Sequence, residues 1–245
     1  MNNFIFTGLI ISLLSSTAPC TITSSKYVTQ TNKSNLQSNL FRSRVKVVSK
    51  ECKIKNDYFE SDLKYPVIKG LKDKSIEKQI NSMIENDVIT FRNRLSKAAK
   101  KNKDKSIKEN YELLPYLAYT TFKVINLNDD FISFYIDYYE LTGGAHGSTF
   151  RKSYNIDLKT GKVLNLNDVL KNIPNYKETI DKYIYDEISK KPEVYFIDSF
   201  KGIYGDISFN LDKSNLIIYF QQYEIAPYSS GIVEFKIPIL SLSSF

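Results

Sequence analysis

Helical periodicity marks two stretches of this chain. Between Ser75 and Ala99 apolar residues recur at steps of three or four, which predicts a long amphipathic helix with one face against a core. That face consists of Ile76, Ile80, Met83, Ile84, Val88, Phe91, Leu95 and Ala98. We interpret the lysine-rich run that follows, KAAKKNKDKSIK, as the solvated end of this helix rather than as a binding patch. A shorter helix is predicted in NYKETIDKYIYDEISK, where isoleucines recur at four-residue steps.

Strand patterns surround both helices. The segment RVKVVSKECKIKND alternates apolar and polar positions, and YLAYTTFKVINL and DFISFYIDYYEL are rich in β-branched and aromatic side chains. Further strands are predicted in LKYPVIKGL, FRKSYNIDL, DISFNL, LIIYFQQYEI and IVEFKIPI. Ahead of the second helix, Asn167 or Asp168 is expected to be an N-cap. The pattern predicts an α+β fold with antiparallel sheets, one long amphipathic helix and a smaller C-terminal helix-plus-sheet unit.

The N-terminus has the pattern of an exported protein. Residues 4–14 form an apolar run followed by small polar residues, which is typical of a signal peptide and too short for an ordinary membrane span. We therefore predict a signal peptide over residues 1–20 and a flexible lead-in over residues 21–42, and a mature chain that is secreted or associated with the cell surface, without an integral membrane span. If cleavage leaves Cys20 in place, it can pair with Cys52; otherwise Cys52 stands alone.

Composition narrows the classes of partner. The chain has 245 residues, 42% of them hydrophobic, which suits a globular protein with a sizeable core. Its formal net charge of +7 draws an exported protein toward anionic polymers of the cell wall, and export makes nucleic acid an unexpected partner. One histidine and two cysteines are few ligands for a transition-metal site, and no calcium-loop spacing occurs. We therefore expect no metal and no cofactor.

The only histidine of the chain, His146, lies in the glycine-rich stretch TGGAHGS between two predicted strands. Gly143, Gly144 and Gly147 are expected to supply positive φ angles to a hairpin turn. A phosphate-binding loop would open onto a helix, and a nucleophile such as Ser148 would need an oxyanion hole that no motif indicates. We expect His146 to cap or hydrogen-bond the turn, and we assign His146 and Ser148 to a partner-binding surface.

The stretch QQYEIAPYSSG is the second loop of interest. Pro227 stiffens it, and an aromatic residue in a rigid loop, here Tyr228, is typical of a binding rim. The alternative is a hairpin whose tyrosine packs on its own sheet. The strand carboxylates Asp137, Glu140 and Glu224 are the residues that glycan cleavage would use, although no pattern supports that chemistry.

Two long motifs resemble a known family. YYELTGGAHGSTFRKSYNIDLKTGK and IYFQQYEIAPYSSG are similar to the extracellular domain family shared by the anti-sigma factor RsiV and the non-catalytic N-terminal part of the peptidoglycan deacetylase PdaC. The resemblance covers residues 45–240 and implies two tightly joined parts, a PdaC-like part over residues 43–148 and an RsiV-like part over residues 149–245. The sigma-binding segment, the membrane span and the deacetylase domain of these proteins are not expected here, so neither activity carries over.

The resemblance and the charge together predict a secreted, non-catalytic binding module of the bacterial cell envelope. Its ligand is expected to be an anionic cell-wall polymer or a wall-active protein such as a lysozyme, which the RsiV domain receives. The alternative is a hydrolase of unrecognised type that acts on cell-wall glycans.

Overall fold

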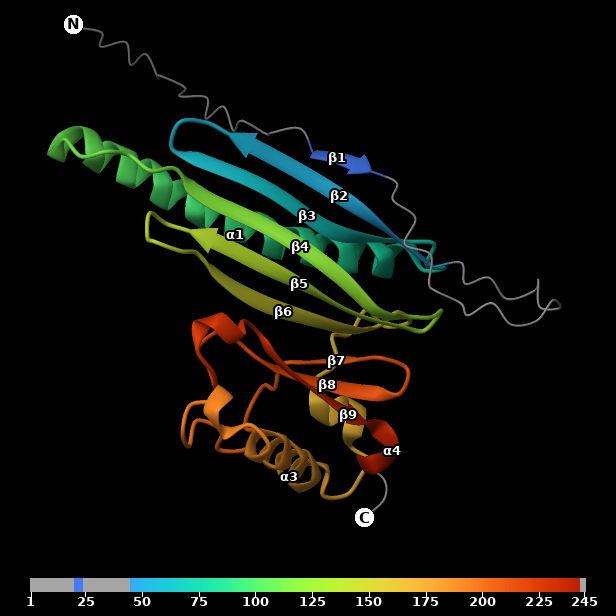
Figure 1. Cartoon of the computed structure of the whole chain (residues 1–245). Coiled ribbons are helices and arrows are strands. Elements are labelled where there is room, and N and C mark those ends of the chain that lie inside the picture. The colour runs from blue at the N-terminus through green and yellow to red at the C-terminus, as the bar shows by residue number, and fades with distance from the viewer. Residues whose placement is uncertain (1–19, 24–44, 243–245) are drawn as a thin grey trace, which may run out of the picture.

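The computed structural model describes residues 20–23 and 45–242, and residues 1–19 of the predicted signal peptide lie outside this part (Figure 1). A six-stranded sheet forms the first half of the molecule, with its strands in sequence order. One long helix, α1, lies across one face of this sheet. The elements are β1 (Cys20–Thr23), β2 (Lys46–Lys55), β3 (Phe59–Lys69), α1 (Lys74–Glu109), β4 (Tyr116–Leu127), β5 (Phe131–Leu141) and β6 (Ser148–Asp157).

Helix α1 is longer than the sequence pattern indicates. It begins after Asp73, whose carboxylate accepts hydrogen bonds from the first-turn N–H groups, and it ends at Asn110 in a left-handed conformation. The lysine-rich run expected at its end is therefore part of the helix. Because α1 crosses from one end of the sheet to the other, β3 and β4 pair in parallel. The first sheet is therefore mixed, whereas the sequence pattern predicted only antiparallel pairing.

The first core lies between α1 and the sheet. Ile80, Ile84 and Val88 are fully buried against alternate residues of the strands, whereas Phe91, predicted to face the core, is only partly buried. Alternate residues of β5 and β6 point away from α1 and are mostly polar, as strand geometry requires of a sheet with one apolar face.

The second half of the molecule is a smaller helix-plus-sheet unit, as predicted. Its three-stranded antiparallel sheet lies between β6 and α3, and α3 covers the face that points away from the first half (Figure 1). Asn165 is the N-cap of α2 and Asp168 is the third helical residue of the same capping box, so neither Asn167 nor Asp168 is the cap that the sequence pattern suggested. The elements are α2 (Leu166–Leu170), α3 (Tyr176–Ser189), β7 (Phe209–Leu211), β8 (Asn215–Phe220), β9 (Val233–Pro238) and α4 (Ile239–Leu242).

Strand β6 shifts the predicted division of the chain. A boundary between residues 148 and 149 falls at the start of β6, yet β6 is the edge strand of the first sheet and pairs with β5 along its whole length. The physical reason is that Tyr154 and Ile156 fill the first core, so the strand cannot leave it. The first sheet therefore extends to Asp157, and the chain enters the second unit after it.

The contact between the two units is polar. Asn210 of β7 donates hydrogen bonds from Nδ2 to the Phe134 carbonyl and to Ser133 Oγ, both at 3.0 Å, and Asn155 donates from Nδ2 to the Phe209 carbonyl at 2.8 Å. All of these side chains are buried. Because buried amides must keep their partners, this network fixes the orientation of the two units.

A disulfide joins Cys20 to Cys52, which answers the question that the sequence left open. The bridge holds β1 against β2, where the two cysteines are direct cross-strand partners. Residues 21–23, expected to be part of a flexible lead-in, are therefore an edge strand. The rest of that predicted lead-in lies outside the described residues.

Candidate functional site

Two loops, one from each unit, meet beside the start of β6. The Tyr228 hydroxyl donates a hydrogen bond to the Gly147 carbonyl at 2.8 Å, and its ring stacks on the His146 ring with centroids 4.5 Å apart. His146 thus contributes a stacking contact across the two units instead of the expected hydrogen bond to its own turn. Tyr228 does not simply pack on its own sheet, because it contacts the loop of the first unit.

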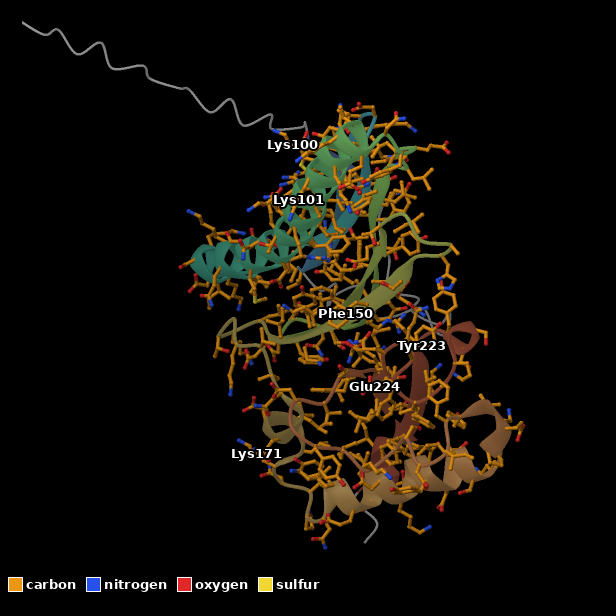
Figure 2. The ribbon with its side chains drawn as sticks, turned by 90° about the vertical axis from the view of Figure 1, so that its left-hand side faces the viewer. Lys100, Lys101, Phe150, Lys171, Tyr223 and Glu224 are labelled. Carbon is orange, nitrogen blue, oxygen red and sulfur yellow. A yellow bond between two sulfur atoms is a disulfide. The ribbon has the colours of Figure 1, made fainter. Side chains whose placement is uncertain are left out.

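Tyr223 is a member of this site that the sequence reasoning missed. Its ring lies 5.6 Å from that of Tyr228, and its side chain is 57% exposed. We call His146, Tyr223, Pro227 and Tyr228 the aromatic rim. Figure 2 shows Tyr223 and Glu224 at the level where the two units meet.

The backbone of Tyr223 is strained. Its φ of 64° lies in the left-handed region, which a bulky side chain rarely adopts. Among the residues that the structure describes, the other non-glycine residues with positive φ are Asn110, Asn175 and Asp198, whose short polar side chains tolerate this conformation. Strain of this kind persists only where the surroundings enforce it, and it occurs often at functional sites.

The surroundings of Tyr223 do enforce its position. Gln222 accepts a hydrogen bond from the Thr149 N–H at 2.6 Å, and Gln221 bonds both backbone groups of Arg151. These two side chains satisfy the open edge of β6, which would otherwise invite pairing with another strand. Glu224 accepts from the Gln221 N–H at 2.6 Å. The loop is therefore fixed on both sides of Tyr223.

The three glycines of the first loop have different roles, and only one has the role predicted for all of them. Gly143 has a positive φ of 90°, but Gly144 and Gly147 do not. At Gly147 a Cβ atom would lie 2.4 Å from Tyr139 Cζ and 2.6 Å from the Glu140 carbonyl, so the requirement there is space. At Gly144 the nearest atom would be 3.7 Å away, which leaves room for a side chain.

Ser148 does not join the rim. It opens β6 and borders a cavity of about 430 Å³ between α1 and the β5–β6 hairpin. The cavity has an apolar floor that includes Phe91, Tyr138 and Phe150, and the ion pairs Arg94–Glu140 and Lys152–Asp87 flank it. Side chains of β6 alternate between this cavity and the second unit, which separates Ser148 from the loop contacts.

Behind the rim, Arg151 ties the two units together. Its guanidinium makes two hydrogen bonds with Asp137, at 2.6 and 2.9 Å, contacts Glu234 of β9, and lies 3.5 Å from the centre of the Tyr135 ring. Burial disfavours the charge, but the hydrogen bonds and attraction of the carboxylates outweigh it and raise the pKa of Arg151. The side chain is therefore a permanent buried cation held by both units.

The carboxylates considered for glycan cleavage are all engaged. Asp137 is held by Arg151, Glu140 pairs with Arg94, and Glu224 accepts a backbone N–H. Over residues 20–23 and 45–242, no cluster of three or more His, Cys, Asp or Glu side chains is placed to hold a metal ion. No helix in the same part of the chain is long and apolar enough to cross a membrane.

The fold and the rim define a two-unit α+β protein whose aromatic contact surface is built from both units. Two family models match it in succession. A model described as Deacetylase PdaC matches residues 52–149, and one described as a protein of unknown function, DUF3298, matches residues 167–239. The predicted resemblance is thereby confirmed.

Curated relatives agree with these matches. The chain is 25% identical over 198 residues to the anti-sigma-V factor RsiV of Bacillus subtilis, which is 77% of this chain and 66% of that protein. It is 22% identical over 111 residues to the peptidoglycan-N-acetylmuramic acid deacetylase PdaC of the same organism, which is 43% of this chain. The chain thus spans 66% of the length of the first relative and 24% of the second.

Solved structures share the fold. A DUF3298-family protein from Bacteroides fragilis superposes with a TM-score of 0.58 at 18% identity, over 83% of this chain and 95% of that one. Another from Pseudomonas aeruginosa superposes with a TM-score of 0.52 at 19% identity, over 82% and 93% of the two chains. These likenesses establish the α+β architecture.

Proposed function

We propose that this protein is a secreted, non-catalytic binding module of the bacterial cell envelope, and that its aromatic rim binds a wall-active protein such as a lysozyme. The observation that carries the proposal is Tyr223, an exposed aromatic residue held in a strained backbone conformation beside Tyr228. The similarity to an anti-sigma factor and to a peptidoglycan deacetylase supports an envelope setting. The disulfide supports export, because such bonds persist in oxidising compartments.

The chemistry of the rim suits a protein ligand. Aromatic side chains that are already fixed lose little conformational entropy on binding, and they dominate the energetics of protein interfaces. Residues 142–147 and 221–232 contain one charged side chain, Glu224, with His146 neutral. A basic lysozyme therefore meets no cation at the rim, although the whole chain carries a net charge of +7.

The hydrolase alternative has less support. Its candidate carboxylates Asp137, Glu140 and Glu224 are held by an arginine, an arginine and a backbone N–H. A general acid and a nucleophile need to face a common substrate site. Alternation along β5 instead places Glu140 at the cavity beside α1 and Asp137 on the opposite face, toward the second unit. The rim offers no cation to an anionic wall polymer, so a ligand of that class would need a different surface.

Replacing Tyr223 with glycine is the sharpest test of the rim. Glycine adopts positive φ without strain, which offsets its entropic cost, so the free energy of unfolding should change by no more than about 1 kcal/mol in either direction. Loss of the exposed ring should weaken binding to immobilised lysozyme at least about tenfold, the scale of an interface hot spot. Denaturant melts and biolayer interferometry measure the two effects. Tyr228 is a poorer probe, because its hydroxyl also fixes Gly147.

Asn175→Gly is the matched control, since Asn175 also has a positive φ, at 53°, but lies at the start of α3. It should leave lysozyme binding unchanged. If Tyr223→Gly bound lysozyme as tightly as the parent, the aromatic rim would not be the lysozyme-binding surface. A parent protein that binds neither lysozyme nor purified cell wall would refute the proposed function itself.

A further inference from the structure

The last three turns of α1 carry an exposed face of lysines. Residues 97–109 contain six lysines against Asp104 and Glu109, a surplus of four positive charges within a chain of net charge +7. Lys103 pairs with Asp57 and Lys105 pairs with Glu109. Lys97, Lys100, Lys101 and Lys108, which we call the lysine face, are exposed and have no carboxylate partner among the described residues.

Helix geometry places these four side chains together. At about 100° per residue, Lys97, Lys101 and Lys108 fall within an arc of roughly 40°, and Lys100 lies about 60° to one side. The face is about 16 Å long at a rise of 1.5 Å per residue. Figure 1 shows this end of α1 reaching beyond the β2–β3 hairpin, and Figure 2 shows Lys100 and Lys101 on it.

Repulsion within the lysine face is only partly offset by Asp104, which lies on the same side of the helix but forms no ion pair with these four lysines. Like charges three and four residues apart on a helix repel each other, as Lys97 does with Lys100 and Lys101. The helix gains no compensating ion pair at these positions from the rest of the described chain. A multivalent anion bound along the helix would offset this repulsion by attracting each lysine.

The sequence pattern favoured a solvated helix end over a binding patch, but the arrangement of the unpaired lysines on one side of α1 favours a ligand. We propose that the lysine face binds a linear phosphodiester polyanion of the cell wall, of the poly(glycerol phosphate) type. Lysine ammonium groups are compact cations that bind phosphate as point charges, and a row of them suits a chain of regularly spaced phosphates. The proposal relies on the proposed function only for the envelope setting. It assigns the polymer to a surface other than the rim.

A lipid surface suits this helix less well. A helix that lies in a membrane interface needs a free apolar face opposite its lysines. In α1 that side is buried within the protein, through Leu95, Ala99 and Ser106. Ile107 is the one exposed large apolar side chain between residues 97 and 109.

The test compares two variants with the same change in net charge. Lys97, Lys100, Lys101 and Lys108 are replaced by glutamine in one variant, and the exposed lysines Lys171, Lys177, Lys201 and Lys213 of the second unit in the other. Glutamine is a good helix former, so melts should show both variants folded. Binding is measured to immobilised poly(glycerol phosphate) at low and at high salt.

The parent should bind the polymer at low salt and be released at high salt, because screening weakens contacts between exposed charges. The lysine-face variant should bind at least about tenfold more weakly, and the control less than about threefold, since local contacts outweigh net charge. Equal weakening of both variants overturns the proposal, as does a parent that binds phosphatidylglycerol vesicles and not the polymer. Tyr223→Gly should bind the polymer like the parent. If the parent binds lysozyme through the rim but not the polymer, this inference fails while the proposed function stands.

Discussion

Replacing Arg151 with methionine should lower the free energy of unfolding by about 1–3 kcal/mol, because Asp137, whose side chain is only 22% exposed, loses its charged hydrogen-bond partner. Arg151 is 8% exposed, and its carboxylate partners Asp137 and Glu234 come from the two different units. Its loss therefore weakens the contact between the units as well as the fold of β6. Urea melts of the purified protein measure the change.

Lys152 supplies the matched control on the same strand. It also forms an ion pair, with Asp87, but its side chain is 45% exposed, and Asp87 keeps a second hydrogen bond from Tyr154. Lys152→Met should therefore cost less than about 1 kcal/mol. A variant with Arg151→Met, Asp137→Asn and Glu234→Gln should recover part of the loss, since no carboxylate is then left unpaired. Equal costs at Arg151 and Lys152 would show that the buried network does not stabilise the junction.

The helices and strands can be predicted where one face is buried, because burial makes apolar residues recur at the period of the element. The segments YLAYTTFKVINL and DFISFYIDYYEL coincide with β4 and β5 to within a residue, since burial of one face makes β-branched and aromatic side chains recur along both strands. The end of α1 is not visible in this way. Beyond Ala99 few of its residues are buried, so the apolar period stops ten residues before the helix does.

The pairing of strands is less visible than the strands themselves. β3 and β4 pair in parallel because α1 returns the chain to the end of the sheet at which β3 began. No local pattern in the sequence indicates where the helix returns the chain. β6 belongs to the first sheet because Tyr154 and Ile156 pack into the first core. The alternating pattern of β6 would look the same if the strand packed in the second unit. The resemblance divided the chain at residues 148 and 149, whereas the first sheet continues through β6 to Asp157.

The sequence indicated the two loops that form the site, but not how their side chains are arranged in space. Pro227 and Tyr228 were recognised from the composition of their loop, and Tyr228 does meet His146. Tyr223 was missed because its exposure and its positive φ are set by bonds of Gln221 and Gln222 to β6, which no neighbouring residue type indicates. The sequence likewise does not say whether a glycine is needed for its φ angle or for its small size.

That distinction yields a second large expected effect, at Gly147. A Cβ there would press on Tyr139, whose ring stacks on Tyr119, and on the Glu140 carbonyl in the β5 backbone. Neither neighbour moves freely, so Gly147→Ala should lower the free energy of unfolding by about 1–3 kcal/mol, as overpacking does in a core. The shift should also displace the carbonyl that Tyr228 holds and weaken lysozyme binding.

Gly144→Ala, three residues earlier in the same loop, isolates the steric cause. Its added methyl group would meet no atom closer than 3.7 Å and its φ is not positive, so stability should stay within about 0.5 kcal/mol of the parent. Thermal melts of the two variants, followed by lysozyme binding under native conditions, compare them directly. If Gly144→Ala proved the more damaging of the two, the loop would depend on backbone conformation at residue 144 and not on the space that residue 147 leaves for Tyr139.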